Sequence, residues 1–388
     1  MATRRRLWSR NAAFSTALAA SLSRNARGEN VSRPSTELIR VGTIALGAES
    51  HMQRIWSAMI NPGMPSVWPT RTTRMLITHA WDSRPEVTEK FARTYGCEPV
   101  KRYDDMVGKV DAMIFGGFAE VKWWPQLVKP YLEAGIPCFI NRPFAYSMKA
   151  AKEIVETARK HNAPILCTDE RENTKEAVVG RNLVEKLLKD GKTILGGNSQ
   201  NATVREYPMH AVHGLYYMLA MFGTDVERVS YQADGWWKDV TPSTDSPMHY
   251  GLLTLQFRGI DLPGFGKQEE SFLVSQLQLS RGNISWANIR VYHDGGWTDI
   301  DQRSAHGGVM KGGDYFTFFP TVVAMQRMFE TREMPWSYDY ILQKTKIFIA
   351  GFKSHLEHGG AMIPVDDLPD EWEAPSPHPD WIDESIFS

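Results

Sequence analysis

The pattern of apolar and polar positions changes near residue 168. Before this point, short apolar runs alternate with amphipathic segments, which predicts strands that alternate with helices. We expect five buried strands, at residues 38–46, 75–81, 110–115, 137–141 and 165–168. The helices between them are expected at residues 52–59, 85–95, 124–133 and 147–160. This alternation predicts an α/β fold built on a parallel, doubly wound Rossmann sheet.

After residue 168 the pattern is that of an α+β domain with a largely antiparallel, open sheet. Two helices are expected first, at residues 174–189 and 209–222. Runs of alternating apolar and polar residues then predict strands at residues 226–233, 250–257, 271–279 and 285–292. Two further helices are expected at residues 320–331 and 338–357. We therefore predict a targeting segment, a Rossmann domain, an α+β substrate and oligomerisation domain, and an acidic, proline-rich tail, at residues 1–35, 36–168, 169–365 and 366–388.

Composition and charge indicate which binding partners and which kinds of site the protein does not have. Hydrophobic residues make up 42% of the chain and charged residues 23%, as in ordinary globular proteins. The 44 basic and 45 acidic residues leave a net charge of −1, without the positive excess of a nucleic-acid binder. The sequence contains no run of about 18 apolar residues, so no membrane-spanning helix is predicted. The three cysteines, Cys97, Cys138 and Cys167, lie far apart, which argues against a disulfide framework and against a paired-cysteine zinc site.

The first 35 residues have the features of a targeting segment. A basic start, Arg4–Arg6, precedes a mildly apolar stretch at residues 12–22, with Ala17–Ala19 as a cleavage candidate. Thr3–Leu7 also resembles the twin-arginine address that directs proteins to export. We expect an exported, periplasmic protein. A cytoplasmic protein with a basic tail and a mitochondrial transit peptide are the alternatives.

The turn after the first predicted strand is a candidate phosphate site. Backbone N–H groups between a strand and a helix bind anions, and glycines let the ligand approach them. Ala45, Gly47 and Ser50 occupy the glycine positions of the G-x-G-x-x-G pattern. Asp82 ends the second strand, where a carboxylate accepts the ribose hydroxyls of NAD and repels the 2′-phosphate of NADP. NAD is therefore the predicted cofactor, and Arg84 keeps NADP as the alternative.

Over about residues 38–360 the chain resembles the Gfo/Idh/MocA family of oxidoreductases. Four runs carry the resemblance: Val41–Gly47 with His51, Asp82–Glu86 with Phe91–Gly96, Leu132–Ala145, and Glu206–His210 before a helix that ends near Gly223. The resemblance implies NAD binding, a small carbohydrate-like substrate and a homo-oligomer formed through the C-terminal sheet. The cofactor-binding residues that we expect are Ala45, Gly47, Ser50, His51, Asp82, Ser83, Gly116, Gly117, Trp124, Asn141 and Arg142.

The chain departs from the family pattern at its chemical positions. Arg142 stands at the place of a family lysine and Asn141 at the place of a glutamate, while Trp124 corresponds to a family histidine. Because arginine does not deprotonate in proteins, Arg142 can anchor a substrate oxygen but cannot act as a general base.

Oxidation of a secondary alcohol needs a base for the hydroxyl proton, while the nicotinamide takes the hydride. His210 is the candidate acid/base, with Glu206 one helical turn earlier to orient it and Tyr207 to donate to the substrate. His213 shares this helix face. The predicted activity is hydride transfer between NAD and a secondary hydroxyl of a sugar or cyclitol.

Two other functions stay open. Tyr207–His210 also resembles the Y-P-x-H run of the NAD-dependent glycosidases, which oxidise a sugar carbon transiently and then eliminate the aglycone. The arginine at the lysine position leaves a weakly catalytic nucleotide-binding protein as the third possibility. Glu170, Arg171 and Asn173 follow the fifth strand and are expected to face the cleft, and no metal site is predicted.

Overall fold

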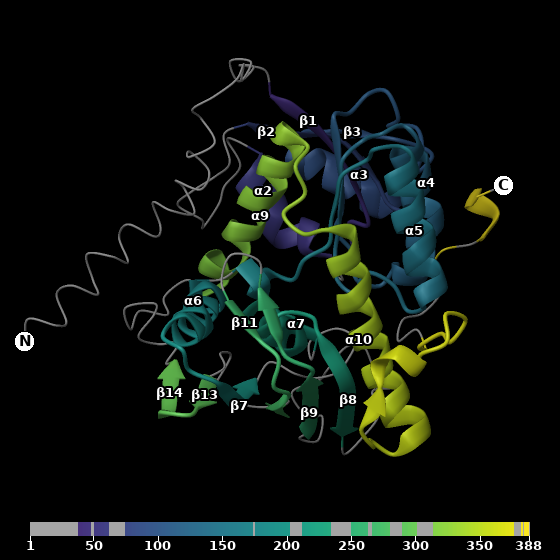
Figure 1. Cartoon of the computed structure of the whole chain (residues 1–388). Coiled ribbons are helices and arrows are strands. Elements are labelled where there is room, and N and C mark those ends of the chain that lie inside the picture. Colours follow the sequence, from purple (N-terminus) through teal and green to yellow (C-terminus); the bar gives the residue numbers. More distant parts are fainter. Residues whose placement is uncertain are drawn as a thin grey trace, which may run out of the picture. The chain divides into compact units, whose positions relative to one another are not determined.

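The computed structural model (Figure 1) describes most of the chain after residue 37. The described residues are 38–47, 50–61, 74–173, 175–201, 212–233, 250–262, 266–279, 289–300, 313–375, 382 and 384–387. The predicted export segment at residues 1–35 lies outside them and stays a prediction. Within the described residues, no helix has both the length and the apolar character needed to cross a membrane.

The first half of the chain forms a six-stranded parallel sheet. Its strand order is β3-β2-β1-β4-β5-β6, the order of dinucleotide-binding Rossmann folds. The strands are β1 (Ile39–Ile44), β2 (Met75–Trp81), β3 (Glu98–Pro99), β4 (Ala112–Phe115), β5 (Cys138–Ile140) and β6 (Ile165–Leu166). All neighbouring strands pair in parallel, so the predicted fold class is confirmed. Because β2 and β4 flank β1, the chain reverses its direction of winding there, where such folds bind ligands.

The helices of this half begin and end at expected signals. Helix α3 (Pro85–Tyr95) has proline in its first turn and ends at Gly96, whose φ of 69° suits a glycine cap. Helix α5 (Met148–Lys160) begins after Ser147, whose side chain accepts the N–H of Ala150. The remaining helical segments are η1 (Met52–Trp56), α2 (Ser57–Ile60), η2 (Val121–Trp123) and α4 (Trp124–Glu133).

The second half carries a seven-stranded mixed sheet in the order β14-β13-β7-β12-β9-β8-β15. Its strands are β7 (Ile194–Asn201), β8 (Val226–Ala233), β9 (Tyr250–Phe257), β12 (Phe272–Leu279), β13 (Ile289–His293), β14 (Gly296–Ile300) and β15 (Ile363–Pro364). Among the strands that the structure describes here, only β7 and β12 pair in parallel, so the sheet is largely antiparallel as predicted. A small hairpin, β10 (Ile260–Leu262) and β11 (Gly266–Gln268), accompanies it.

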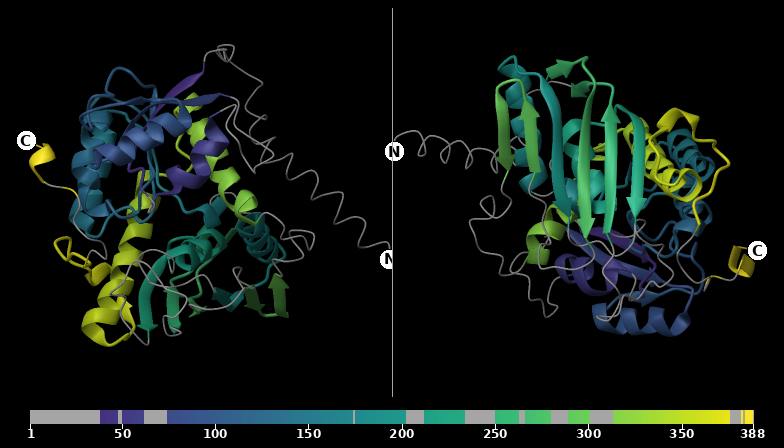
Figure 2. Two further views of the ribbon diagram at one scale, coloured as in Figure 1. Left: turned by 180° about the vertical axis from the view of Figure 1, so that it is seen from behind. Right: turned by 90° about the horizontal axis from the view of Figure 1, so that it is seen from below.

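Helices cover one face of this sheet, and the right-hand view of Figure 2 looks onto the strands from the other side. The covering helices are α6 (Lys175–Lys189), α7 (Val212–Phe222) and α10 (Tyr338–His358). Every residue of α7 is buried, which fits a helix that lies between the sheet and the rest of the protein.

Helix α9 (Gly313–Thr331) links the two halves. It begins seven residues before the predicted start, and Pro320 lies inside it. Its residues Val322, Met325 and Met328 share a buried apolar cluster with Val41 and Ile77 of the Rossmann sheet. The predicted second domain therefore contributes a helix to the core of the first, and the domain boundary near residue 168 stays a prediction.

Candidate functional site

The turn after β1 is held by hydrogen bonds of its backbone and of the Ser50 side chain. Ala45 follows the strand with a φ of 65°, a left-handed conformation that glycine adopts more readily than alanine. Gly47 accepts the N–H of Ser50, and Ser50 Oγ accepts the N–H of Met52, where η1 begins. The predicted phosphate-binding residues thus form one tight turn at the carboxyl end of β1.

Substituting Ala45→Gly should stabilise the protein. A left-handed conformation costs an L-residue with a side chain about 1–2 kcal/mol, part of which is offset by the greater freedom of glycine in the unfolded chain. We expect the free energy of unfolding to rise by about 0.5–1 kcal/mol in urea titrations. Ala58→Gly, in helix α2, is the matched control and should lower it. A lower free energy of unfolding for Ala45→Gly would contradict the inference that the backbone of Ala45 is strained.

The end of β4 approaches this turn closely because two glycines stand there. A Cβ on Gly116 would lie 2.2 Å from Met52 Cγ, and one on Gly117 would lie 2.7 Å from the Cβ of Ala45. Gly116 also accepts the N–H of His51 at 3.2 Å. The predicted cofactor residues Gly116 and Gly117 therefore lie beside the turn, as expected for residues at the point where the winding reverses.

Asp82 ends β2 as predicted, but its carboxylate already has protein partners. Oδ2 accepts the N–H of Leu46 at 2.7 Å, so the side chain also braces the turn after β1. Arg84 supplies the remaining donors: its backbone N–H and Nε reach Oδ1 at 3.1 and 2.8 Å, and Nη2 reaches Oδ2 at 3.2 Å. Four donors occupy the roughly four acceptor positions of a carboxylate. Ser83 lies in the turn between these two residues, partly buried.

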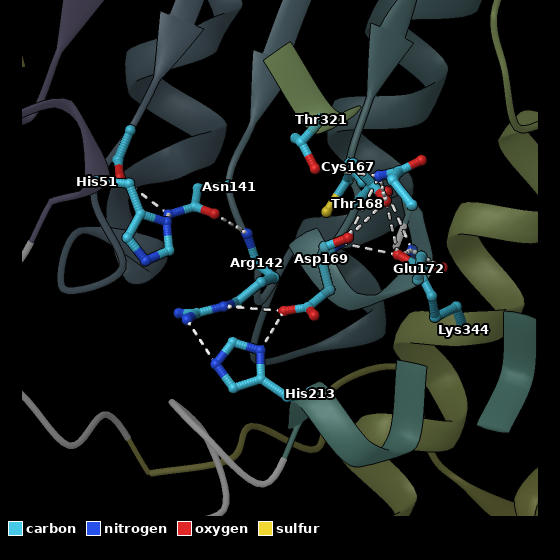
Figure 3. Close-up of polar contacts among 12 residues, drawn as sticks. His51, Asn141, Arg142, Cys167, Thr168, Asp169, Glu172, His213, Thr321 and Lys344 are labelled. Atoms are coloured by element: carbon cyan, nitrogen blue, oxygen red, sulfur yellow. Dashed lines mark hydrogen bonds and ion pairs between the residues drawn. The ribbon is translucent and has the colours of Figure 1, made fainter. Parts of the chain in front are cut away.

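Residues after β5 extend the same edge of the sheet. Asn141 Nδ2 donates to the carbonyl of Gly116 at 2.9 Å and lies 3.4 Å from His51 Nδ1 (Figure 3). The ring of His51 packs edge-on against Trp56, Phe118 and Phe318. Asn141 and His51, predicted from runs 90 positions apart, are therefore brought together.

Trp124 begins α4 with its side chain fully buried. Its ring packs edge-on against Phe115, with the centroids 5.8 Å apart. Within the described part of the chain, no hydrogen-bond partner is found for its indole N–H. Trp124 thus lies close to the carboxyl end of β4, but in the core.

Arg142, Asp169 and His213 form a buried cluster between the two halves (Figure 3). Their exposed fractions are 2%, 0% and 4%. Asp169 Oδ2 accepts a hydrogen bond from Arg142 Nε at 3.2 Å and lies 2.6 Å from His213 Nδ1. Arg142 Nη2 lies 3.1 Å from His213 Nε2. The three side chains close a ring of polar contacts.

The geometry of this cluster sets the tautomer of His213. A guanidinium can only donate, so Nε2 of His213 must accept from Arg142. Nδ1 therefore carries the proton and donates to Asp169. The imidazole is neutral and directs the lone pair of Nε2 toward the arginine, while the carboxylate stands ready to stabilise an imidazolium.

The sequence predicted part of this site. Arg142 was expected, and His213 was placed on the face of the candidate base. Glu206, Tyr207 and His210 lie outside the described residues and stay predictions. Asp169 was missed, although it directly follows a parallel strand, and ligands bind at the carboxyl ends of such strands. Of the neighbouring candidates, Asn173 Nδ2 donates to Thr168 Oγ1, to Thr321 Oγ1 and, at 3.4 Å, to the backbone carbonyl of Asp169, so it contacts the cluster through the main chain of Asp169.

Comparisons with known proteins agree with the fold. Residues 63–168 match the model of a family described as oxidoreductases with an NAD-binding Rossmann fold, Gfo/Idh/MocA. This match confirms the prediction of NAD as cofactor. A search of curated proteins gave no match.

Solved structures resemble most of the chain at low identity. Scyllo-inositol dehydrogenase from Lactobacillus casei, with bound NAD(H) and scyllo-inositol, has a TM-score of 0.61 at 13% identity, covering 85% of this chain and 100% of its own. The WlbA dehydrogenase from Bordetella pertussis, in complex with NADH and UDP-GlcNAcA, has 0.60 at 14%, covering 85% and 98%. GenD2 from gentamicin A biosynthesis, in complex with NAD, has 0.64 at 12%, covering 87% and 99%. At such identities the likeness concerns the fold.

Proposed function

We propose that this chain, whose residues 63–168 belong to the Gfo/Idh/MocA family of NAD-binding oxidoreductases, transfers a hydride between NAD and a secondary hydroxyl of a sugar or cyclitol. The observation that carries the proposal is the buried cluster of Arg142, Asp169 and His213. It lies at the carboxyl ends of β5 and β6, on the same edge of the sheet as the turn at Gly47.

The residues at this edge fit NAD, with one rearrangement. The turn from Ala45 to Ser50 would hold the pyrophosphate, and Asp82 would hold the adenosine ribose. For Asp82 to accept two hydroxyls, the guanidinium of Arg84 must leave it, which is feasible because the Arg84 side chain is 25% exposed. NAD, when bound, supplies the acceptor for the hydride.

The cluster supplies the proton chemistry. A substrate hydroxyl that reaches His213 Nε2 would replace the Arg142 N–H there and could pass its proton to that nitrogen. The resulting imidazolium would be stabilised by Asp169, 2.6 Å from Nδ1. Arg142, always charged, would donate to the substrate oxygen and stabilise the negative charge that develops on it. His210 remains the alternative base.

The proposed activity is tested by incubating the purified protein with NAD⁺ and a panel of inositols, aldoses and uronic acids. Net growth of NADH absorbance with one of them supports a dehydrogenase. Phenol release from aryl glycosides without net NADH supports the glycosidase reaction that the Tyr207–His210 run resembles. Neither signal, with NAD still bound in calorimetry, would contradict both enzymatic activities.

Substituting Arg84→Ala should shift cofactor preference toward NAD. The change removes two of the four donors on Asp82, Nε and Nη2, and leaves the carboxylate available to ribose hydroxyls. It also removes the cation that would face a 2′-phosphate. We expect NAD⁺ to bind about threefold to tenfold more tightly and NADP⁺ to bind more weakly, measured by calorimetry. Weaker NAD⁺ binding would mean that Arg84 itself contacts the cofactor. Arg93→Ala, on the exposed side of α3, is the control.

The open face of the second sheet is proposed to form a homo-oligomer. It exposes Leu252, Leu273 and Leu277 by 40%, 51% and 38%, beside polar side chains such as Thr254 and Ser275. Apolar residues grouped on one sheet face are typical of an interface. Leu273→Lys with Leu277→Lys should lower the mass measured by light scattering, whereas Leu356→Lys, equally exposed on α10, should not. A wild-type monomer would contradict the proposal.

A further inference from the structure

A buried ion pair lies next to the cluster of Arg142, Asp169 and His213. Lys344, on α10, places Nζ 2.8 and 3.0 Å from the two carboxylate oxygens of Glu172 (Figure 3). Both side chains are fully buried. Charges are costly to bury, and an apolar pair of similar volume often stabilises a fold equally well. The burial of this pair is therefore weak evidence for a purely stabilising role.

On one side the pair fixes the segment that carries Asp169. Glu172 Oε2 accepts the N–H of Asp169 at 2.8 Å and the hydroxyl of Thr168 at 2.9 Å. Lys344 Nζ also donates to the carbonyl of Cys167 at 3.0 Å. Three consecutive residues after β6 are thus bonded to the pair, and the third of them is the carboxylate of the cluster.

On the other side the pair contacts the helix that carries His213. Lys344 Nζ lies 4.2 Å from the ring centroid of Tyr216, three residues after His213 on α7. Tyr340, one turn before Lys344 on α10, donates its hydroxyl to Glu172 Oε1 at 3.2 Å. Burial, with the Glu172 carboxylate beside it, raises the pKa of Tyr340, so its phenol stays protonated and keeps donating.

We propose that Lys344 and Glu172 are positioning residues. They hold Asp169, which follows β6, and His213, on α7, at hydrogen-bond distance from each other. Lys344 is the element common to both sides, since it bonds to the strand end and stacks on the helix. A carboxylate that orients a base works only at hydrogen-bond distance, and errors of about 1 Å in such groups cost about a hundredfold in rate. The catalytic meaning of the pair rests on the proposed function, but its effect on the geometry does not.

The test is the double variant Lys344→Met/Glu172→Gln. It removes both charges together, and the amide oxygen of glutamine can still accept the Asp169 N–H, so no unpaired charge is buried. The matched control is Lys346→Met, which removes an ion pair with Asp366 from the same helix. The first readout is the low-field proton resonance of His213 Nδ1–H, assigned by its loss in His213→Asn. The second readout is kcat, which is compared with the dissociation constant of NAD⁺ for the same variant.

The double variant should move this resonance upfield and lower kcat about tenfold to a hundredfold, with NAD⁺ affinity within about twofold of wild type. Lys346→Met should change none of these values. A folded double variant with wild-type resonance and kcat would overturn the proposal. If the double variant does not fold, Tyr340→Phe decides, because it removes a single donor to Glu172. A smaller shift in the same direction supports the proposal, and an unchanged resonance overturns it.

The two proposals fail in different ways. A wild-type protein that shows the Nδ1–H resonance but transfers no hydride would contradict the proposed function, while the resonance still reports whether the pair positions the cluster.

Discussion

The variant His213→Asn is expected to have a kcat about 10²-fold to 10⁴-fold lower than the wild type, which is the usual contribution of a general base. Asparagine keeps an N–H that can donate to Asp169, but it has no basic nitrogen at the place of Nε2. The fold should survive, because the cluster keeps its ion pair between Arg142 and Asp169. The measurement is the steady-state rate of NADH formation at saturating NAD⁺ and substrate.

The comparison variant is His210→Asn, at the base predicted from sequence. It should keep most of its activity if His213 is the proton acceptor. The opposite result, with His213→Asn active and His210→Asn inactive, would return the role to His210. Asp169→Asn should resemble His213→Asn, because an amide no longer favours the Nδ1–H tautomer or stabilises an imidazolium.

The second large effect concerns stability. Arg142→Met should lower the free energy of unfolding by about 3–5 kcal/mol, since the carboxylate of Asp169 would stay fully buried without its cation. Methionine fills much of the arginine's length, so the loss reports the charge rather than a cavity. Urea titration measures the free energy of unfolding. In binding experiments, the affinity for substrate should fall more than the affinity for NAD⁺.

A surface arginine provides the control for this measurement. Arg258→Met breaks ion pairs with Asp225 and Asp366, but all three side chains are 42% exposed or more, so we expect a change below about 1 kcal/mol. An Arg142→Met variant as stable as this control would mean that Asp169 does not carry a charge in the folded protein.

The Rossmann half could be predicted well because most of its elements have a local signal, although the short, exposed strand β3 was missed. The apolar runs of β1, β2 and β4 and the glycine after α3 are visible in the sequence. Strand β7 was missed because Gly196 and Gly197 interrupt its apolar pattern. A Cβ at Gly196 would lie 2.8 Å from the carbonyl oxygen of Leu273, so glycine is needed where β12 runs close. Strand β14 was missed because most of its residues are exposed at the sheet edge.

The site was predicted only in part, for a different reason. Arg142 belongs to a recognisable run, but Asp169 lies 27 positions away and His213 lies 71 positions away. Asp169 is marked only by its place after a parallel strand, and His213 only by the helix face that it shares with His210. Lys344 is one of three lysines on α10, and nothing in the sequence sets it apart from Lys346 and Lys353. Such groups acquire their chemistry only when three separate elements meet. In the same way, no sequence pattern indicates that Arg84 turns back onto Asp82.

The packing of α9 has a consequence for how the protein is made. Val322, Met325 and Met328 complete the apolar layer over β1 and β2, yet they are synthesised long after the last strand of the Rossmann sheet, β6. A nascent chain of 300 residues would therefore expose part of the Rossmann core to water, even though all six of its strands had left the ribosome. Folding from the amino end cannot finish there, and the exposed apolar surface makes this stage prone to aggregation until the last quarter of the polypeptide emerges.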